Sequence, residues 1–211
     1  MSALAFTGDQ PAPRAVDQRH LGLDLTPAET AILSCTPVVL HAETYNALFA
    51  LGVRGLAITG ARPFADLATE QVVYLEGGRF ELAKDMRDQS NSVPAIIIPC
   101  VNRDGATTDL VAWNMETGAT ATWRGAALLG EENLDAPRID GDRLRVHSTV
   151  LAWLVDGRRG VVVLDAKRAR WPLAEQGLIV ADVDFGVRLL AQLALPQPDI
   201  HVDDEQQRAA A

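Results

Sequence analysis

The stretch Leu178-Ile-Val-Ala-Asp-Val-Asp-Phe-Gly186 carries the pattern that decides the fold class of this chain. A short apolar run ends in two aspartates at positions i and i+2, and a glycine with a further apolar segment follows at once. In an extended strand, side chains at i and i+2 point to the same side. We therefore expect Asp182 and Asp184 to direct their carboxylates toward one point at the end of a buried strand. Carboxylate oxygens in that arrangement suit a hard cation such as Mg²⁺.

A structural interpretation of the same two aspartates stays open beside the metal interpretation. The apolar spacing of residues 186–195 predicts a helix, and aspartate is favoured at the N-cap of a helix. Asp184 stands close before that segment and is the residue we expect to act as the cap. The sequence thus offers two roles for this pair, helix capping and Mg²⁺ binding.

Apolar strands and helical segments alternate through the last third of the chain. The pattern predicts strands at 144–146, 160–164, 178–181 and 200–202, and helices at 149–155, 168–176 and 186–195. Strands that alternate with helices in this way are typical of a parallel sheet covered on both faces. We therefore expect an α/β domain over residues 143–202.

The rest of the chain divides into an N-terminal region and a central region. Strands at 38–40 and 55–59 around a helix at 42–51 predict a β-α-β unit in an N-terminal α/β region, residues 21–92. Apolar runs at 95–98, 109–113 and 117–123 predict an antiparallel β-meander, which with a connector makes up residues 93–142. Residues 1–20 and 203–211 lack apolar periodicity and are expected to be a disordered leader and a loose tail.

Composition and charge limit the classes of partner. The 211 residues are 48% hydrophobic and 22% charged, which is ordinary for a soluble globular protein. A net charge of −9 disfavours nucleic acid as a partner, because an acidic surface repels phosphates. The chain has no signal peptide and no apolar run of the ~18 residues that a membrane span needs, so we expect a cytoplasmic protein. Cys35 and Cys100 form no CxxC pair and are expected to be reduced packing residues.

Residues 95–202 resemble the toprim-type catalytic region of primases, especially primase-like proteins of phages and mobile elements. Ala95-Ile-Ile-Ile-Pro-Cys-Val-Asn-Arg-Asp-Gly105 and Asp109-Leu-Val-Ala-Trp113 look like the antiparallel segment that precedes a toprim domain. The stretch 178–186 looks like the Asp-x-Asp strand end of that domain. The resemblance implies a toprim-like parallel sheet in which Asp182 and Asp184 hold Mg²⁺. It also implies DNA replication as the setting.

The chain departs from the family at the group that handles protons. In the family a glutamate closes the first strand and acts in acid/base chemistry, whereas here that strand is followed by His147. An imidazole with an unperturbed pKa of about 6.5 is suited to proton transfer near neutral pH. His147 and Asp165, which ends the next predicted strand, are therefore the candidate catalytic residues. A hydrogen-bonded structural role for His147 stays open beside this one.

Two functions follow from these patterns. In the first, the departures mean a degenerate catalytic site, and the chain is an accessory or binding protein that acts through a protein partner. In the second, it is a Mg²⁺-dependent phosphoryl-transfer enzyme of primase or nuclease type, with His147 as the base. The enzyme needs cationic side chains for the phosphate. The candidates for that contact are Arg158, Arg159, Lys167 and Arg168.

Overall fold

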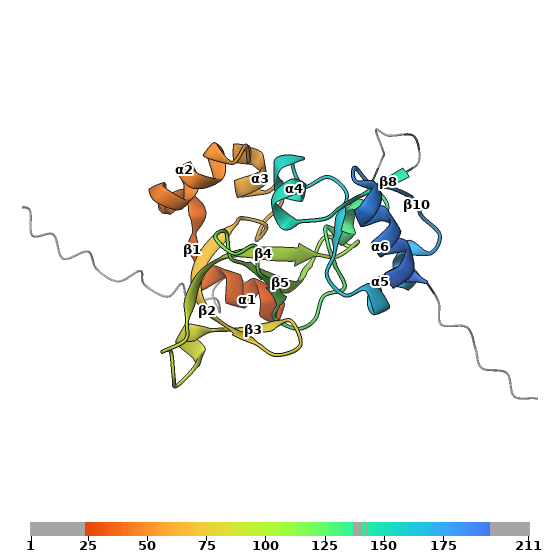
Figure 1. The fold of residues 1–211 in the computed structure, drawn as a ribbon. Coiled ribbons are helices and arrows are strands. Elements are labelled where there is room, and N and C mark those ends of the chain that lie inside the picture. Colours follow the sequence, from red (N-terminus) through yellow and green to blue (C-terminus); the bar gives the residue numbers. More distant parts are fainter. Residues whose placement is uncertain (1–23, 137–140, 142, 195–211) are drawn as a thin grey trace, which may run out of the picture.

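Two sheets build the protein, a barrel from the first half of the chain and an open sheet from the second half (Figure 1). The computed structural model describes residues 24–136, 141 and 143–194. The helices are α1 Pro27–Leu33, α2 Ala42–Ala50, α3 Gly55–Thr59, α4 Val150–Val155, α5 Ala166–Leu173 and α6 Val183–Leu193, with short 3₁₀ turns η2 Val38–Leu40, η3 Ala83–Asp85 and η4 Glu131–Asn133. The strands are β1 Thr36–Pro37, β2 Ala68–Leu75, β3 Arg79–Leu82, β4 Val93–Val101, β5 Thr107–Trp113, β6 Thr120–Thr122, β7 Leu128–Leu129, β8 Arg143–His147, β9 Val161–Val163 and β10 Gly177–Ile179.

The first sheet closes on itself. Its strand order is β1-β2-β3-β6-β5-β4, and β4 also pairs with β2, which joins the two ends. Most pairs are antiparallel, whereas β3 and β6 run parallel. Closure leaves β2 to β6 without a free edge, apart from the short strand β1 that extends β2.

The apolar run at residues 95–98 lies in strand β4, and the packing of this strand explains why the run is continuous and not alternating. Ala95 and Ile97 belong to the same buried cluster as Phe80 of β3, whereas Ile96 and Ile98 belong to a second cluster. Successive side chains of a strand point to opposite faces, so both faces of β4 are covered. Helix α1 contributes to the first cluster, and η2, α2, α3 and α4 contribute to the second. Figure 1 shows α2, α3 and α4 on one side of the barrel.

The second sheet has the order β10-β8-β9-β7. Strands β10, β8 and β9 are parallel, and the short strand β7 pairs with β9 in the antiparallel sense at the edge. Helix α4 connects β8 to β9, and α5 connects β9 to β10. Leu144 and Val146 of β8 pack with Ala169 of α5 and Leu189 of α6 in a third buried cluster. Helices α5 and α6 lie together at the end of the molecule farthest from the barrel (Figure 1).

The α/β class is confirmed, and several of the predicted strands are present. The predicted meander is present as β4, β5 and β6 in antiparallel succession, although its strands are part of the barrel. The three predicted strands near residues 144, 160 and 178 are present as β8, β9 and β10 and are parallel. The predicted strand at 200–202, the leader 1–20 and the tail 203–211 lie outside the described residues.

The predicted β-α-β unit in the N-terminal region is wrong. Residues 38–40 form the 3₁₀ turn η2 and residues 55–59 form the helix α3, so only the middle helix, α2, is as expected. Short apolar runs do not distinguish a strand from a buried helical turn by periodicity.

Within the described residues, no helix is both long and apolar enough to span a membrane.

Candidate functional site

The predicted site residues follow the ends of the three parallel strands. His147 is the last residue of β8, Asp165 lies two residues beyond β9, and Asp182 lies three residues beyond β10. Parallel strands place these positions at one edge of the sheet, where open α/β sheets hold their sites. Their common edge is therefore as expected from the sequence.

A small hollow brings two of these side chains together. It has a volume of ≈ 210 Å³, and its lining includes His147, Ser148, Asp182 and Phe185. Strands β8 and β10 are neighbours in the sheet, which accounts for the meeting of residues 35 positions apart. Asp165 lines a larger groove, described below, and not this hollow.

His147 is held by its surroundings. Its Nε2 lies 2.9 Å from the carbonyl oxygen of Arg159 and 3.5 Å from Oδ2 of Asp156. Burial lowers the pKa of His147 below its usual range, although the Arg159 carbonyl and Asp156 act in the opposite direction. A carbonyl only accepts, so the neutral ring donates from Nε2 and keeps the lone pair of Nδ1 for a proton. The histidine thus retains one nitrogen for acid/base chemistry, with a weakened basicity.

Asp182 begins helix α6. Its Oδ1 accepts a hydrogen bond of 2.6 Å from the backbone N–H of Phe185, so Asp182 is the N-cap. The expectation that Asp184 is the cap is therefore wrong, because the helix begins at Val183, three residues before the predicted start.

The two aspartates do not lie on one strand. Strand β10 ends at Ile179, and Asp184 stands in the first turn of α6. The strand geometry from which their convergence was expected is therefore not present. In the part of the chain that the structure describes, no group of three or more His, Cys, Asp or Glu side chains is arranged to hold a metal ion. Mg²⁺ binding by Asp182 and Asp184 stays a prediction.

Asp165 also begins a helix. Its Oδ1 accepts hydrogen bonds from the backbone N–H groups of Lys167 (2.9 Å) and Arg168 (3.3 Å), so it caps α5. The sequence-based start at residue 168 is two residues late, and Pro172 is accommodated inside the helix. As with Asp182, one carboxylate oxygen is used by the fold, which leaves the second oxygen for other contacts.

The four predicted phosphate contacts separate into three environments. Arg158 points into the protein, where it donates to the carbonyls of Ala57 and Ala65. Arg159 forms an ion pair with Asp156. Neither side chain lines a hollow described here, whereas Lys167 and Arg168 both line a groove of ≈ 1020 Å³ between the barrel and the second sheet. Arg79 and Arg170 line the same groove. Sequence reasoning missed Arg79, because this residue lies on a strand of the barrel, far along the chain from the other three cations.

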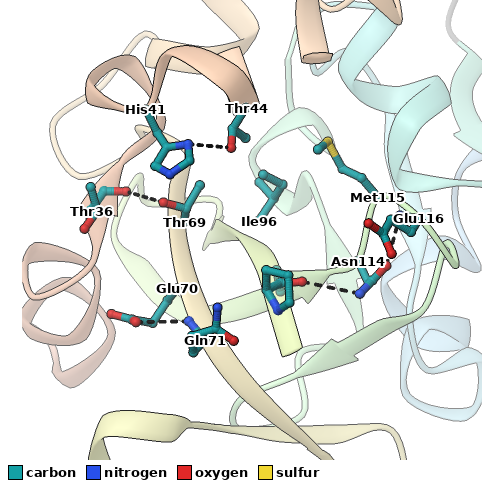
Figure 2. A pocket seen from close by; sticks show the side chains of 12 residues that line it. Thr36, His41, Thr44, Thr69, Glu70, Gln71, Ile96, Asn114, Met115 and Glu116 are labelled. Carbon is teal, nitrogen blue, oxygen red and sulfur yellow. Dashed lines mark hydrogen bonds between the residues drawn. The ribbon is translucent and has the colours of Figure 1, made fainter. Parts of the chain in front are cut away.

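A third hollow lies on the outer face of the barrel (Figure 2). It has a volume of ≈ 310 Å³. Figure 2 shows His41 and Thr44 on one side and Asn114 to Glu116 opposite, with Ile96 between them. Its polar groups largely satisfy one another: His41 Nδ1 lies 2.9 Å from the Thr44 hydroxyl, and Oδ1 of Asn114 accepts from the N–H of Glu116. The Thr44 hydroxyl and the His41 imidazole are thus a hydroxyl and a base in hydrogen-bond contact at one side of this hollow.

Comparisons with protein-family models, with curated proteins and with solved structures each found no match to this chain. The resemblance to toprim-type proteins therefore rests only on the residues quoted above.

Proposed function

We propose that this chain is a binding or accessory protein that acts through a protein partner, with a degenerate form of the toprim-type catalytic constellation. The phage or mobile-element setting and the link to primase-like proteins come from the resemblance of residues 95–202. The structural roles of the candidate residues support the proposal. Asp165 and Asp182 cap helices, and His147 is bonded to the Arg159 carbonyl.

An exposed apolar stripe on α6 is the observation that carries the proposal. Val183, Val187 and Leu190 are 79%, 66% and 75% exposed. Their spacing of four and three residues puts them on one helix face, opposite the side on which Leu189 is buried. An apolar helix face that the described residues leave exposed fits a groove or a helix of another protein. We call Val183, Val187 and Leu190 the α6 stripe.

Charge on the α6 stripe is expected to abolish partner binding. The double substitution Val187→Asp/Leu190→Asp puts two carboxylates where an apolar contact needs desolvation, and we expect at least a tenfold loss of the retained partner. The measurement is quantitative mass spectrometry of proteins retained from host-cell extract by the tagged wild-type protein and by the variant. Both side chains are exposed, so the thermal unfolding midpoint should stay within a few degrees of wild type.

Arg188→Glu is the matched control, because it changes the net charge by the same amount on the same helix, away from the α6 stripe. It should retain the partner at the wild-type level. If both variants lose the partner equally, the interaction is electrostatic and the stripe is not the docking surface. If neither variant loses it, the proposed role of the stripe is wrong.

A second function, Mg²⁺-dependent phosphoryl transfer, is favoured by the small hollow that His147 and Asp182 share. We expect saturable heat on titration with Mg²⁺ if this site holds the ion, and its loss in Asp182→Asn/Asp184→Asn. Asparagine caps a helix about as well as aspartate, so this variant removes charge and keeps the start of α6. Isothermal calorimetry on the two proteins distinguishes the functions: equal heats, or none from the wild type, would remove the metal site on which the enzyme depends.

A further inference from the structure

Two arginines, one from strand β3 of the barrel and one from helix α5, converge near Gly125. Arg79 of β3 donates through Nε to the carbonyl of Trp123 at 3.0 Å, and Arg168 of α5 donates through Nη1 to the carbonyl of Gly125. A Cβ on Gly125 would lie 3.2 Å from Nη1 of Arg79 and 3.0 Å from Nη1 of Arg168. Because both distances are measured from the same Cβ position, the two nitrogens lie within about 6 Å of each other. Two like charges this close repel each other.

The groove around this pair collects positive charge on an acidic protein. We call it the basic groove. Its lining includes one carboxylate, Asp165, and four cationic side chains: Arg79, Lys167, Arg168 and Arg170. That carboxylate already accepts from two backbone N–H groups of α5. Among the described residues, none of the four cations forms an ion pair with a carboxylate. A chain of net charge −9 that concentrates unpaired cations in one groove has a local potential opposite to its overall charge.

Arg170 adds an unsatisfied donor to the basic groove. Its Nη2 donates to the carbonyl of Gln192 at 3.3 Å, whereas its Nε is buried and has no hydrogen-bond partner in the described part of the chain. A buried donor without a partner is destabilising.

We propose that the basic groove binds the phosphate group of an organic phosphate. A phosphate oxyanion is the ligand that neutralises converging guanidinium groups and accepts several of their N–H bonds at once. Arg79 and Arg168 supply the binding point above Gly125, and Lys167 supplies a further positive charge at the rim. No covalent step is involved.

The size of the basic groove and its walls indicate that the ligand extends beyond the phosphate. A volume of ≈ 1020 Å³ exceeds what one oxyanion needs and lies at the upper end for small organic ligands. Apolar side chains, among them Met115, Leu151 and Val163, line the remainder. They suit the organic part of a nucleotide-sized molecule. This site uses neither the α6 stripe nor the hollow of His147, so it stands independently of the proposed function.

The test is titration calorimetry of the full chain with pyrophosphate, with a nucleoside triphosphate and with an eight-nucleotide single-stranded DNA. We expect saturable binding of the phosphate probes by the wild type. Arg79→Gln/Arg168→Gln should weaken it at least tenfold, because the variant removes two charge-assisted contacts to the phosphate. Tighter binding of the triphosphate than of pyrophosphate identifies a small organic phosphate. Tighter binding of the oligonucleotide per phosphate identifies a phosphodiester chain.

Arg54→Gln/Arg87→Gln is the matched control, because both arginines are exposed outside the groove and the net charge changes equally. It should bind as the wild type does. Lys167→Gln alters an exposed side chain that no hydrogen bond in the described structure uses, so it tests the site without affecting folding, and a several-fold loss is expected. Equal weakening by the control, an unchanged affinity of Lys167→Gln and the double variant, or no binding of any probe at millimolar concentration would overturn the proposal.

Discussion

Replacing Arg158 by methionine is expected to lower the free energy of unfolding by about 3 kcal/mol, because a partly buried charge network loses its centre. The guanidinium donates to the carbonyls of Ala57 and Ala65, both at 2.7 Å, and approaches the carbonyl of Ile58 at 3.5 Å. Ala57 and Ile58 stand in the last turn of α3, whose carbonyls have no partner within the helix. One side chain from the second half of the chain thus caps a helix of the first half.

The loss has an electrostatic component as well. Burial lowers the pKa of Arg158 to about 10, and Glu132 and Asp66 act against that shift. Glu132 is itself partly buried and its pKa is raised, chiefly by burial, so removal of Arg158 leaves this carboxyl with less compensation. Urea unfolding monitored by tryptophan fluorescence measures the change in the free energy of unfolding.

Arg159→Met is the control for this prediction. Arg159 is adjacent in the chain, but its side chain is 60% exposed, whereas that of its partner Asp156 is 16% exposed. Because solvent reaches the guanidinium and screens this ion pair, we expect a loss of about 1 kcal/mol or less. A similar loss in both variants would mean that charge, and not the position of the Arg158 side chain, decides stability.

Asp109→Ala is expected to lower the free energy of unfolding by about 3 kcal/mol. Asp109 lies in β5 and is 4% exposed. Its Oδ1 accepts from the N–H groups of Leu110 and Arg124, both at 2.8 Å, and its Oδ2 accepts from the N–H of Ala126 at 2.6 Å. One carboxylate therefore fixes the segment that leaves β6. The alanine variant leaves the two N–H groups of that segment without their acceptor.

Thr108→Ala is the matched control, because Thr108 is the exposed neighbour on the same strand, and it should change the free energy of unfolding by less than about 0.5 kcal/mol. Asp109 also holds the residues on both sides of Gly125, where Arg79 and Arg168 converge. Thermal unfolding by calorimetry with and without pyrophosphate would thus show a lower midpoint and a smaller ligand-induced rise in the Asp109 variant. A midpoint within two degrees of wild type would contradict the role assigned to this carboxylate.

Periodicity identified the elements in which one pattern dominates. The run at 95–98 and the return strand at 109–113 are in β4 and β5, and the alternation after residue 143 gave three parallel strands. The short segments 38–40 and 55–59 failed because three to five apolar residues fit a strand and a helical turn equally well. In the structure, Val38, Ala57 and Ile58 are buried in one cluster with residues of α2 and α4. Helix α4 is distant from these segments in the sequence, so local patterns could not predict this contact.

The predictions about the site also divide into those that depend on local residue order and those that depend on tertiary contacts. The sequence by itself determined that the chain folds as α/β, that a meander precedes three parallel strands, and that His147, Asp165 and Asp182 follow strand ends, because each of these depends on local residue order. Only the tertiary structure decided what those side chains contact. His147 and Asp182 line the same hollow, and Arg158 donates a hydrogen bond to the carbonyl of Ala57. Arg79 and Arg168, 89 residues apart in the chain, lie close together at Gly125. These contacts depend on how the two sheets pack and not on spacing along the chain.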